Sequence, residues 1–237
     1  MFLAEFFGTM TLIVLGDGVV ANVLLNKSKG QNSGWIVITA GWMIAVMSGV
    51  FVSSSLGGPG SLNPAGMIAG LLAGGNMGDT ITAIVAQFLG AFVGAIVVFL
   101  LYLPHWEVTS DAGLKLAVFS TGPAIRKPMQ NLLTEILATF MLIFVAGAIF
   151  SGKVGIGGTA GLGPLAIGAL IWGLGLSLGG PTGYALNPAR DLGPRIAHAV
   201  LPIPGKGSSD WEYSWVPVVG PIIGAVLAMV VRLAIGL

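Results

Sequence analysis

Six long apolar stretches, separated by more polar connections, divide the chain. Each holds the 20 or so mostly apolar residues that a helix needs to cross the hydrocarbon core of a bilayer. No basic segment precedes the first stretch, which is also too long for a signal-peptide core, so we expect a mature transmembrane helix there. The pattern predicts an all-α membrane protein with six transmembrane helices. The stretches are 2–25, 35–55, 80–103, 131–151, 160–178 and 215–236.

Two shorter apolar pieces, 64–73 and 188–200, cannot cross a bilayer alone. Each follows a stretch rich in Gly and Pro, and each begins within an Asn-Pro-Ala triplet. Short, Gly/Pro-interrupted segments at matching places in two halves indicate a site near the bilayer midplane. We therefore expect two re-entrant half-helices. The triplets are Asn63-Pro64-Ala65 and Asn187-Pro188-Ala189.

The two halves of the chain resemble each other in register. Glu5 and Glu135 stand 130 positions apart, as do Gly90 and Gly220, whereas the two triplets stand 124 apart. Such self-similarity indicates an internal repeat. Three spans in each copy is an odd number, so the copies have opposite orientations and form an inverted repeat. We expect one channel domain, 1–237, with a first repeat over about 1–103 and a second over about 131–237.

The triplets also predict how the half-helices begin. Asn is a favoured N-cap, and Pro at the first helical position sacrifices no hydrogen bond, so Pro64 and Pro188 would start the helices. In an inverted repeat the two N-termini meet near the midplane, and each carries a partial positive charge. Facing positive ends oppose protons and cations, while the amides of Asn63 and Asn187 donate to a passing oxygen. The sequence therefore predicts a path for neutral hydrogen-bonding molecules.

Composition agrees with a lipid-exposed surface. Hydrophobic residues make up 55% and charged residues 8% of the 237 residues, and the mean hydropathy is +0.94, whereas a soluble domain carries about 25% charge. A net charge of +1 gives no reason to expect a nucleic-acid partner. The chain has no Cys, which excludes disulfides and thiolate metal sites. We expect no metal, no cofactor and no enzymatic activity.

Ionisable side chains at membrane depth are costly and indicate function by default. Arg190 directly follows the second triplet. For Glu5 and Glu135 we favour carboxylates that accept backbone N–H bonds from the neighbouring re-entrant loops over a proton relay, because they occupy equivalent repeat positions. His198 is expected to pack at the end of its half-helix, and His105 to lie in a loop of the long connection 104–130. Asp17 and Asp191 also fall within the membrane region.

The sequence resembles the major intrinsic protein family, the aquaporins and glycerol facilitators, over essentially its whole length. The resemblance implies six helices, two half-helices, a pore in every subunit, a homotetramer, and an integral multi-pass protein of the plasma membrane. Four runs carry it: Ala4-Glu5-Phe6-Phe7-Gly8-Thr9, Ser61-Leu62-Asn63-Pro64-Ala65, Gly183-Tyr184-Ala185-Leu186-Asn187-Pro188-Ala189-Arg190-Asp191 and Gly220-Pro221-Ile222-Ile223-Gly224-Ala225.

The resemblance is closer to the glycerol facilitators, which carry Asp after the second Asn-Pro-Ala-Arg, as Asp191 does here. It also implies a narrow filter made by two aromatics, a Gly and the Arg. Counting from Asn187 places Gly175 and Tyr184 in it, and counting back from Asn63 places Trp42, if one extra residue is allowed in 57–61. Gly175 would leave room for a carbon backbone. The expected filter is Trp42, Gly175, Tyr184 and Arg190.

The implied function is a passive channel that conducts glycerol, other small uncharged solutes and water while excluding protons and ions. Ser61, Tyr184 and Pro59 depart from the family pattern. They leave open a water-selective channel, or one for dihydroxyacetone, urea, hydrogen peroxide or protonated lactic acid. An ion-coupled secondary transporter is less favoured, because the intramembrane charges flank the loops instead of forming a relay chain. A structural junction protein ranks last.

Overall fold

The computed structural model describes residues 1–154 and 161–237, and every regular element in these ranges is a helix. The start of the predicted 160–178 stretch, at residue 160, lies outside them. The helices are α1 (Phe2–Leu24), α2 (Trp35–Ser55), α3 (Pro64–Leu72), α4 (Met77–Leu101), α5 (Leu103–Val108), α6 (Ala112–Phe119), α7 (Pro128–Ile149), α8 (Leu162–Leu178), α9 (Pro188–Val200) and α10 (Val216–Ile235).

The predicted transmembrane helices are present. Among the described residues, α1, α2, α4, α7 and α10 are long and apolar enough to cross a membrane. The sixth, α8, has 17 apolar residues and a length of about 25 Å at 1.5 Å per residue. Helices α4 and α7 start earlier than predicted, because Asn76 caps α4 by accepting from the Asp79 N–H and Pro128 opens α7.

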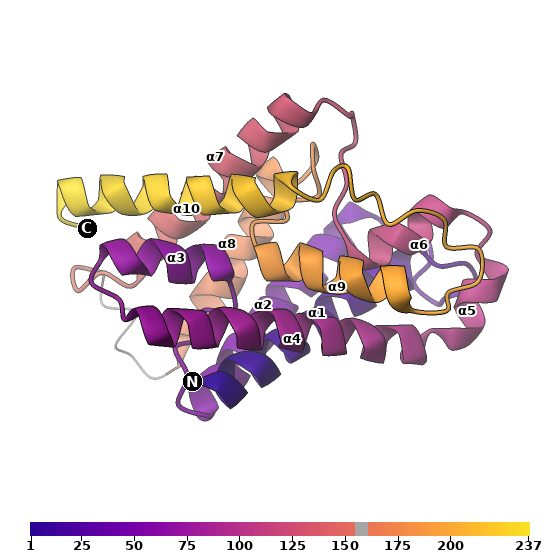
Figure 1. Ribbon diagram of the computed structural model, residues 1–237, viewed down its shortest axis with the longest axis horizontal. Helices are drawn as coiled ribbons and strands as arrows, with labels where there is room; N and C mark the ends of the chain where they lie inside the picture. The colour runs from indigo at the N-terminus through magenta and orange to yellow at the C-terminus, as the bar shows by residue number, and fades with distance from the viewer. Residues whose placement is uncertain (155–160) are drawn as a thin grey trace.

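The two halves interlock through their half-helices. Figure 1 shows α3 and α9 lying between α10 and α4, with both chain termini toward one end of the molecule. Helix α9 of the second half packs on α4 of the first, and α3 of the first half packs on α10 of the second. Each half-helix therefore packs on a helix from the other half of the chain.

Matching glycines allow the helices of each half to approach closely. A Cβ on Gly90 of α4 would lie 2.3 Å from the carbonyl oxygen of Phe6 on α1, and one on its register partner Gly220 of α10 would lie 2.6 Å from Cβ of Glu135 on α7. Small residues at such contacts let helix backbones pack in a membrane, where no hydrophobic force drives helices together. The glycine register noted in the sequence therefore corresponds to equivalent helix pairs, α1–α4 and α7–α10.

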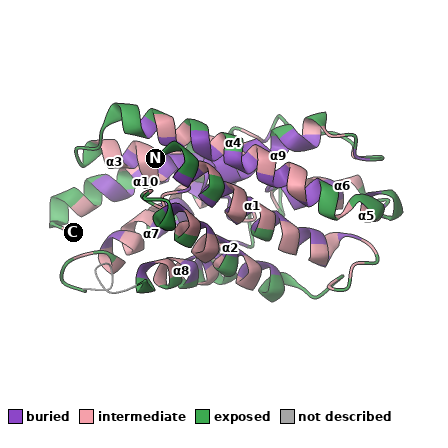
Figure 2. Cartoon of the chain, turned by 90° about the horizontal axis from the view of Figure 1, so that it is seen from below, coloured by how far each residue is buried: buried purple, intermediate pink, exposed green. Residues whose placement is uncertain are grey.

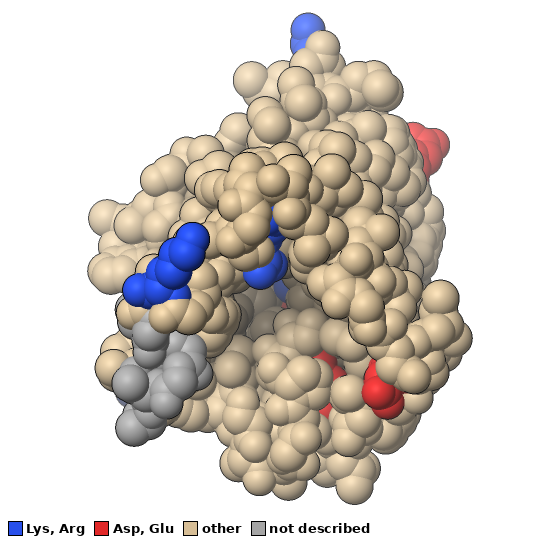
Figure 3. All heavy atoms as spheres, turned by 90° about the vertical axis from the view of Figure 1, so that its left-hand side faces the viewer, with Lys and Arg blue, Asp and Glu red and all other residues tan. Residues whose placement is uncertain are grey.

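The outer surface is apolar. Large hydrophobic side chains are exposed along the long helices, among them Leu89 on α4 and Leu137 on α7, and Figure 2 shows exposed and buried residues alternating along these helices. Figure 3 views one end of the molecule, where charged atoms are few and a hollow opens near the centre. With several apolar helices and so little charge, the protein is an integral multi-pass membrane protein.

The expectation of a loop at His105 is wrong, because the connection 104–130 contains the short helices α5 and α6. Asp111 caps α6 by accepting from the Gly113 N–H. The indole of Trp106 on α5 is fully buried and stacks between Phe99 and Phe119, with ring centroids 6.2 and 5.5 Å away. These buried aromatics fold the connection onto the end of the bundle.

Candidate channel site

The two half-helices meet at their N-termini and are tied together there by the two triplet asparagines. Oδ1 of Asn63 accepts from the Ala65 N–H at 2.9 Å, and its Nδ2 donates to the carbonyl of Leu186 at 2.8 Å. Asn187 makes the equivalent contacts with the other loop: its Oδ1 accepts from the Ala189 N–H at 3.0 Å, and its Nδ2 donates to the carbonyl of Leu62 at 2.6 Å. Each amide nitrogen carries two hydrogens, so each Asn keeps a second donor.

The loops that lead into the half-helices have unusual backbone. Leu62, Tyr184 and Leu186 adopt positive φ values of 53°, 40° and 56°, a left-handed conformation that costs a non-Gly residue energy. This conformation occurs directly before both triplets, where it turns the carbonyls of Leu62 and Leu186 toward the opposite Asn. Strained backbone of this kind persists only where its surroundings hold it in place.

Two buried carboxylates provide that support. Glu5 of α1 accepts the N–H groups of Ser61 at 3.2 Å and Leu62 at 2.8 Å, and also binds Ser53 Oγ and Gln87 Nε2 at 2.8 and 2.6 Å. These contacts link Glu5 on α1 to α2, α4 and the first loop, and so hold that loop in place.

Glu135 of α7 is placed in the same way against the second loop. It accepts the N–H groups of Ala185 and Leu186, each at 3.0 Å, and the hydroxyl of Thr182 at 2.6 Å. Both carboxylates therefore contact the loop of their own repeat through backbone N–H groups, as the sequence predicts.

A cavity of about 300 Å³ lies beside these loops. Its polar lining includes Asn63, Asn187 and Arg190, together with the loop residues Gly60 and Ser61. The rest of the lining is largely apolar. It includes Val46, Val50, Leu142, Ile143, Ile167 and Ile171. The cavity is therefore amphipathic, lined by donors from the half-helix starts and by hydrocarbon from α2, α7 and α8.

Three of the four predicted filter residues line this cavity: Trp42, Tyr184 and Arg190. The guanidinium carbon of Arg190 lies 4.0 Å from the centroid of the Trp42 ring, within range of a cation–π interaction. Trp42 is only 5% exposed and therefore packs inside the bundle and not as an anchor at the membrane interface. Arg190 is 7% exposed and also lies 3.5 Å from Asp17 on α1.

Gly175 is close to this group but does not line the cavity. A Cβ on Gly175 would lie 2.8 Å from Cζ and 2.9 Å from the hydroxyl of Tyr184, and 2.8 Å from Cγ2 of Thr39. The space that Gly175 leaves is thus occupied by the Tyr184 ring, and our expectation that this space is open to solute is wrong. The indole of Trp35 closes the slot, since its Nε1 donates to the Gly175 carbonyl at 3.0 Å and its ring contacts Tyr184 edge-on.

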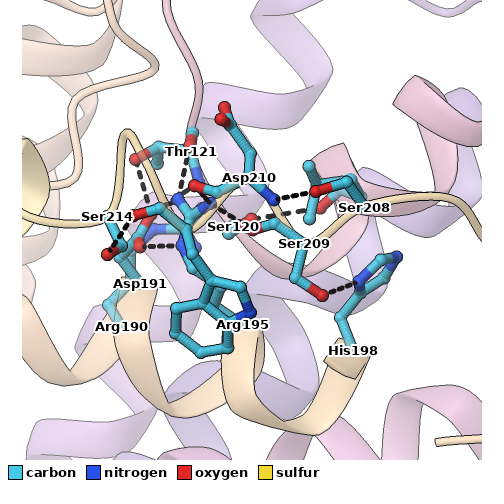
Figure 4. Close-up of polar contacts among 12 residues, drawn as sticks. Ser120, Thr121, Arg190, Asp191, Arg195, His198, Ser208, Ser209, Asp210 and Ser214 are labelled. Atoms are coloured by element: carbon cyan, nitrogen blue, oxygen red, sulfur yellow. Dashed lines mark hydrogen bonds and ion pairs between the residues drawn. The ribbon is translucent and has the colours of Figure 1, made fainter. Parts of the chain in front are cut away.

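Asp191 and Arg195 form a second buried cluster behind the half-helix, shown in Figure 4. Asp191 accepts the N–H and hydroxyl of Thr121 at 2.8 and 2.7 Å and pairs with Arg195 at 2.8 Å. Arg195 is fully buried and also donates to the carbonyls of Thr121 and Ser209. This cluster anchors the start of α9 to the two long connections, 104–130 through Thr121 and 201–214 through Ser209. His198 packs at the last turn of α9, as expected, with Nδ1 2.8 Å from Ser209 Oγ.

The structure adds residues that sequence reasoning did not assign to the site. Asp17 is one of these, and its charge at membrane depth is a sufficient sequence signal of a partner. Sequence reasoning gave Trp35 no part in the site, and only the folded chain shows its indole against Gly175. Thr121 lies 70 positions from Asp191, and no local pattern connects them. Among the described residues, no group of three or more His, Cys, Asp or Glu side chains could hold a metal ion.

An apolar helical bundle with two half-helices that meet beside an amphipathic cavity has the architecture of a membrane channel. The sequence profile of the Major intrinsic protein family matches residues 1–232, and the chain belongs to this family.

Curated relatives cover nearly the whole chain. A "Probable glycerol uptake facilitator protein" of Thermotoga maritima is 58% identical over 96% of this chain and 95% of its own length. "Glycerol uptake facilitator protein 3" of Lactiplantibacillus plantarum is 53% identical over 95% of this chain and 92% of its own. The solved aquaglyceroporin of Plasmodium falciparum superposes with a TM-score of 0.86 at 29% identity, covering 98% of this chain and 93% of that chain.

Proposed function

We propose that this protein is a passive channel that conducts glycerol, other small uncharged solutes and water. The observation that carries the proposal is the amphipathic cavity at the junction of the two half-helices. Glycerol has hydroxyls along one side and CH groups along the other. Arg190, Asn63 and Asn187 donate hydrogen bonds, while the apolar part of the lining receives the carbon backbone. The names of the relatives, glycerol uptake facilitators at 58% and 53% identity, support the same solute.

Ion exclusion follows from the half-helices in this proposal. The N-terminal ends of α3 and α9, each equivalent to roughly half a positive charge, face each other at the triplets. Asn63 and Asn187 each have one donor already bound to the opposite loop. The remaining donors orient a passing oxygen, which interrupts a water chain that would otherwise carry protons. The protein supplies no catalysis in this function.

Trp42, Tyr184 and Arg190 form the narrow filter in this proposal, and Gly175 acts behind it by giving the Tyr184 ring its place. Glu5 and Glu135 hold the strained loops, Pro64 and Pro188 start the half-helices, and Asp191 anchors α9. A homotetramer in the plasma membrane, with each subunit conducting, completes the proposal. The exposed apolar faces of the helices suit both lipid and subunit contacts. Native mass spectrometry of the detergent-solubilised protein tests the tetramer, and a monomer would contradict it.

The function is tested in liposomes that contain the purified protein. A glycerol gradient should produce fast shrinkage by water loss and then reswelling as glycerol enters, at rates well above those of empty liposomes and without any ion gradient. Shrinkage without reswelling would replace the proposal with a water-selective channel. Reswelling that requires a proton or sodium gradient would replace it with a coupled transporter. Urea, dihydroxyacetone and lactic acid at low pH, run in parallel, define the solute range.

A further inference from the structure

Asp17 is a fully buried carboxylate in the middle of the transmembrane helix α1. Its Oδ1 lies 3.5 Å from Nη1 of Arg190, whereas its Oδ2 has no hydrogen-bond partner among the described residues. A carboxylate at membrane depth is costly unless it is paired. Its only ion-pair partner in the part of the chain that the structure describes is Arg190, so its role concerns that side chain.

Arg190 in turn has few contacts to hold its guanidinium. Its backbone N–H is used by the Asn187 cap. Within the described residues its side chain has two polar or cation–π contacts, the Asp17 carboxylate at 3.5 Å and the face of Trp42 at 4.0 Å. The other carboxylate nearby in sequence, Asp191, is bound to Thr121 and Arg195. Asp17 is therefore the group that balances the charge of Arg190.

The neighbour of Asp17 supports the same side of the site. A Cβ on Gly16 would lie 2.3 Å from Cζ3 of Trp42, so the absence of a side chain at Gly16 lets the indole pack directly on α1. Two consecutive residues of α1 thus fix the two contacts of Arg190: Gly16 seats the ring beneath the guanidinium, and Asp17 supplies the opposite charge beside it. The first transmembrane helix contributes to the filter in this way although it does not carry either triplet.

We infer that Asp17 is a positioning and charge-balancing residue, which makes the filter a neutral ion pair in place of a lone cation; this inference rests on the proposed function. A lone guanidinium in a cavity of low dielectric constant attracts small anions, since charge interactions several ångströms apart are strong there. With Asp17 beside it, Arg190 keeps its donors for hydroxyl groups while the attraction for anions is largely cancelled. Asp17 acts through Arg190, because it is buried and does not line the cavity.

The test compares nitrate entry into liposomes that contain wild-type protein, Asp17→Asn or the matched control Asp79→Asn. Asn has the shape of Asp without its charge, and Asp79 is an exposed carboxylate at the start of α4, away from the cavity. The liposomes are placed in a potassium nitrate gradient with valinomycin, so that potassium follows freely and swelling reports nitrate entry. Water and glycerol permeabilities are measured on the same preparations.

We expect Asp17→Asn to raise nitrate entry about tenfold, on the order set by removing one unit charge a few ångströms from Arg190. Nitrate should then also slow glycerol flux in this variant, because the anion occupies the unpaired guanidinium. Asp79→Asn should match wild type in both measurements. A purely structural role for Asp17 predicts neither nitrate effect. Water conduction with unchanged nitrate entry and no inhibition by nitrate would overturn the inference.

The double variant Asp17→Asn/Arg190→Gln keeps the test decisive if Asp17→Asn alone conducts no water. Removing both members of a buried pair is far less disruptive than removing one, so the double variant should recover water conduction with nitrate entry near the wild-type level. Failure of the double variant to recover water conduction would also overturn the inference. Wild-type liposomes that pass water but no glycerol would overturn the proposed function, while the nitrate comparison among the variants would still measure the charge balance.

Discussion

The two half-helices begin in the same way but differ in what surrounds them. Both start with Asn and Pro, and both follow a residue with left-handed backbone. The loop before each half-helix donates backbone hydrogen bonds to a buried glutamate. Helix α3 is nine residues long and carries no charge, whereas α9 has 13 residues with Arg190, Asp191, Arg195 and His198 all buried. The shared features build the junction of the two half-helices, and the charged residues of α9 build the proposed filter and its anchor.

This difference indicates that the two halves of the chain depend on different contacts. The first loop depends on Glu5 and its four hydrogen-bond donors. The second has Glu135 with three donors, and in addition the Asp191–Arg195 cluster fixes its half-helix to the long connections. Substitutions in the two halves should therefore have unequal effects, and the following experiments measure that inequality.

The largest effect is expected from Asp191→Asn. This change removes one partner of a fully buried pair and leaves the Arg195 charge uncompensated, which costs about 3–5 kcal/mol. Thermal unfolding in detergent, followed by tryptophan fluorescence, should show a strongly lowered midpoint, and the yield of conducting protein should fall. A midpoint within a degree of wild type would mean that α9 is not anchored by this pair. Asp79→Asn is the matched control.

A smaller effect, unequal between the halves, is expected from Glu5→Gln and Glu135→Gln. Each change leaves backbone N–H groups without their full acceptor, at about 1–3 kcal/mol for each unsatisfied buried group. Glu5→Gln should lower water permeability per folded protein more than Glu135→Gln, since the second loop keeps the Asp191 anchor. A larger loss of water permeability in Glu135→Gln would contradict this expectation. Equal losses would show that the Asp191 anchor does not support the second loop.

Gly175→Ala tests the slot that holds Tyr184. The added methyl group would contact the ring at 2.8 Å, and such overpacking costs about 1–3 kcal/mol. Because the ring borders the cavity, its displacement should slow glycerol several-fold and water less, as the ratio of the two liposome rates shows. Gly173→Ala on the same helix is the control, since its Cβ would meet open space. Equal slowing of glycerol and water would show that Gly175 has no part in the proposed filter.

The smallest effect is expected from Arg126→Gln, outside the membrane-spanning helices. Arg126 pairs with Asp210 at 2.5 Å, and this hydrogen bond raises the pKa of the guanidinium, but the Arg126 side chain is 51% exposed. Exposed pairs contribute about 0–1 kcal/mol. The unfolding midpoint and both permeabilities should stay close to wild type. A loss comparable with that of Asp191→Asn would show that the exposed connection, and not the buried cluster, holds the second half.

The sequence by itself determined the helices and the residues at which the two half-helices begin. Apolar length fixes which segments can span a bilayer, and Asn followed by Pro fixes where a helix begins, so the starts at Pro64 and Pro188 agree with the structure. The internal register predicted that Glu5 and Glu135 support equivalent loops, because a repeated charge at membrane depth needs a repeated partner. These features are local or periodic, and a linear sequence displays them directly.

Only the tertiary structure decided the contacts between residues that are far apart in the chain. Arg190 meets Asp17 across 173 positions, and Thr121 meets Asp191 across 70. The Gly175 space belongs to Tyr184 because the Trp35 indole and Thr39 close the slot around the ring. Helical periodicity fixes which side chains share a face but not which helix that face meets. The proposed charge balance of Arg190 therefore depends on the tertiary structure, which places Asp17 of α1 beside Arg190 of α9.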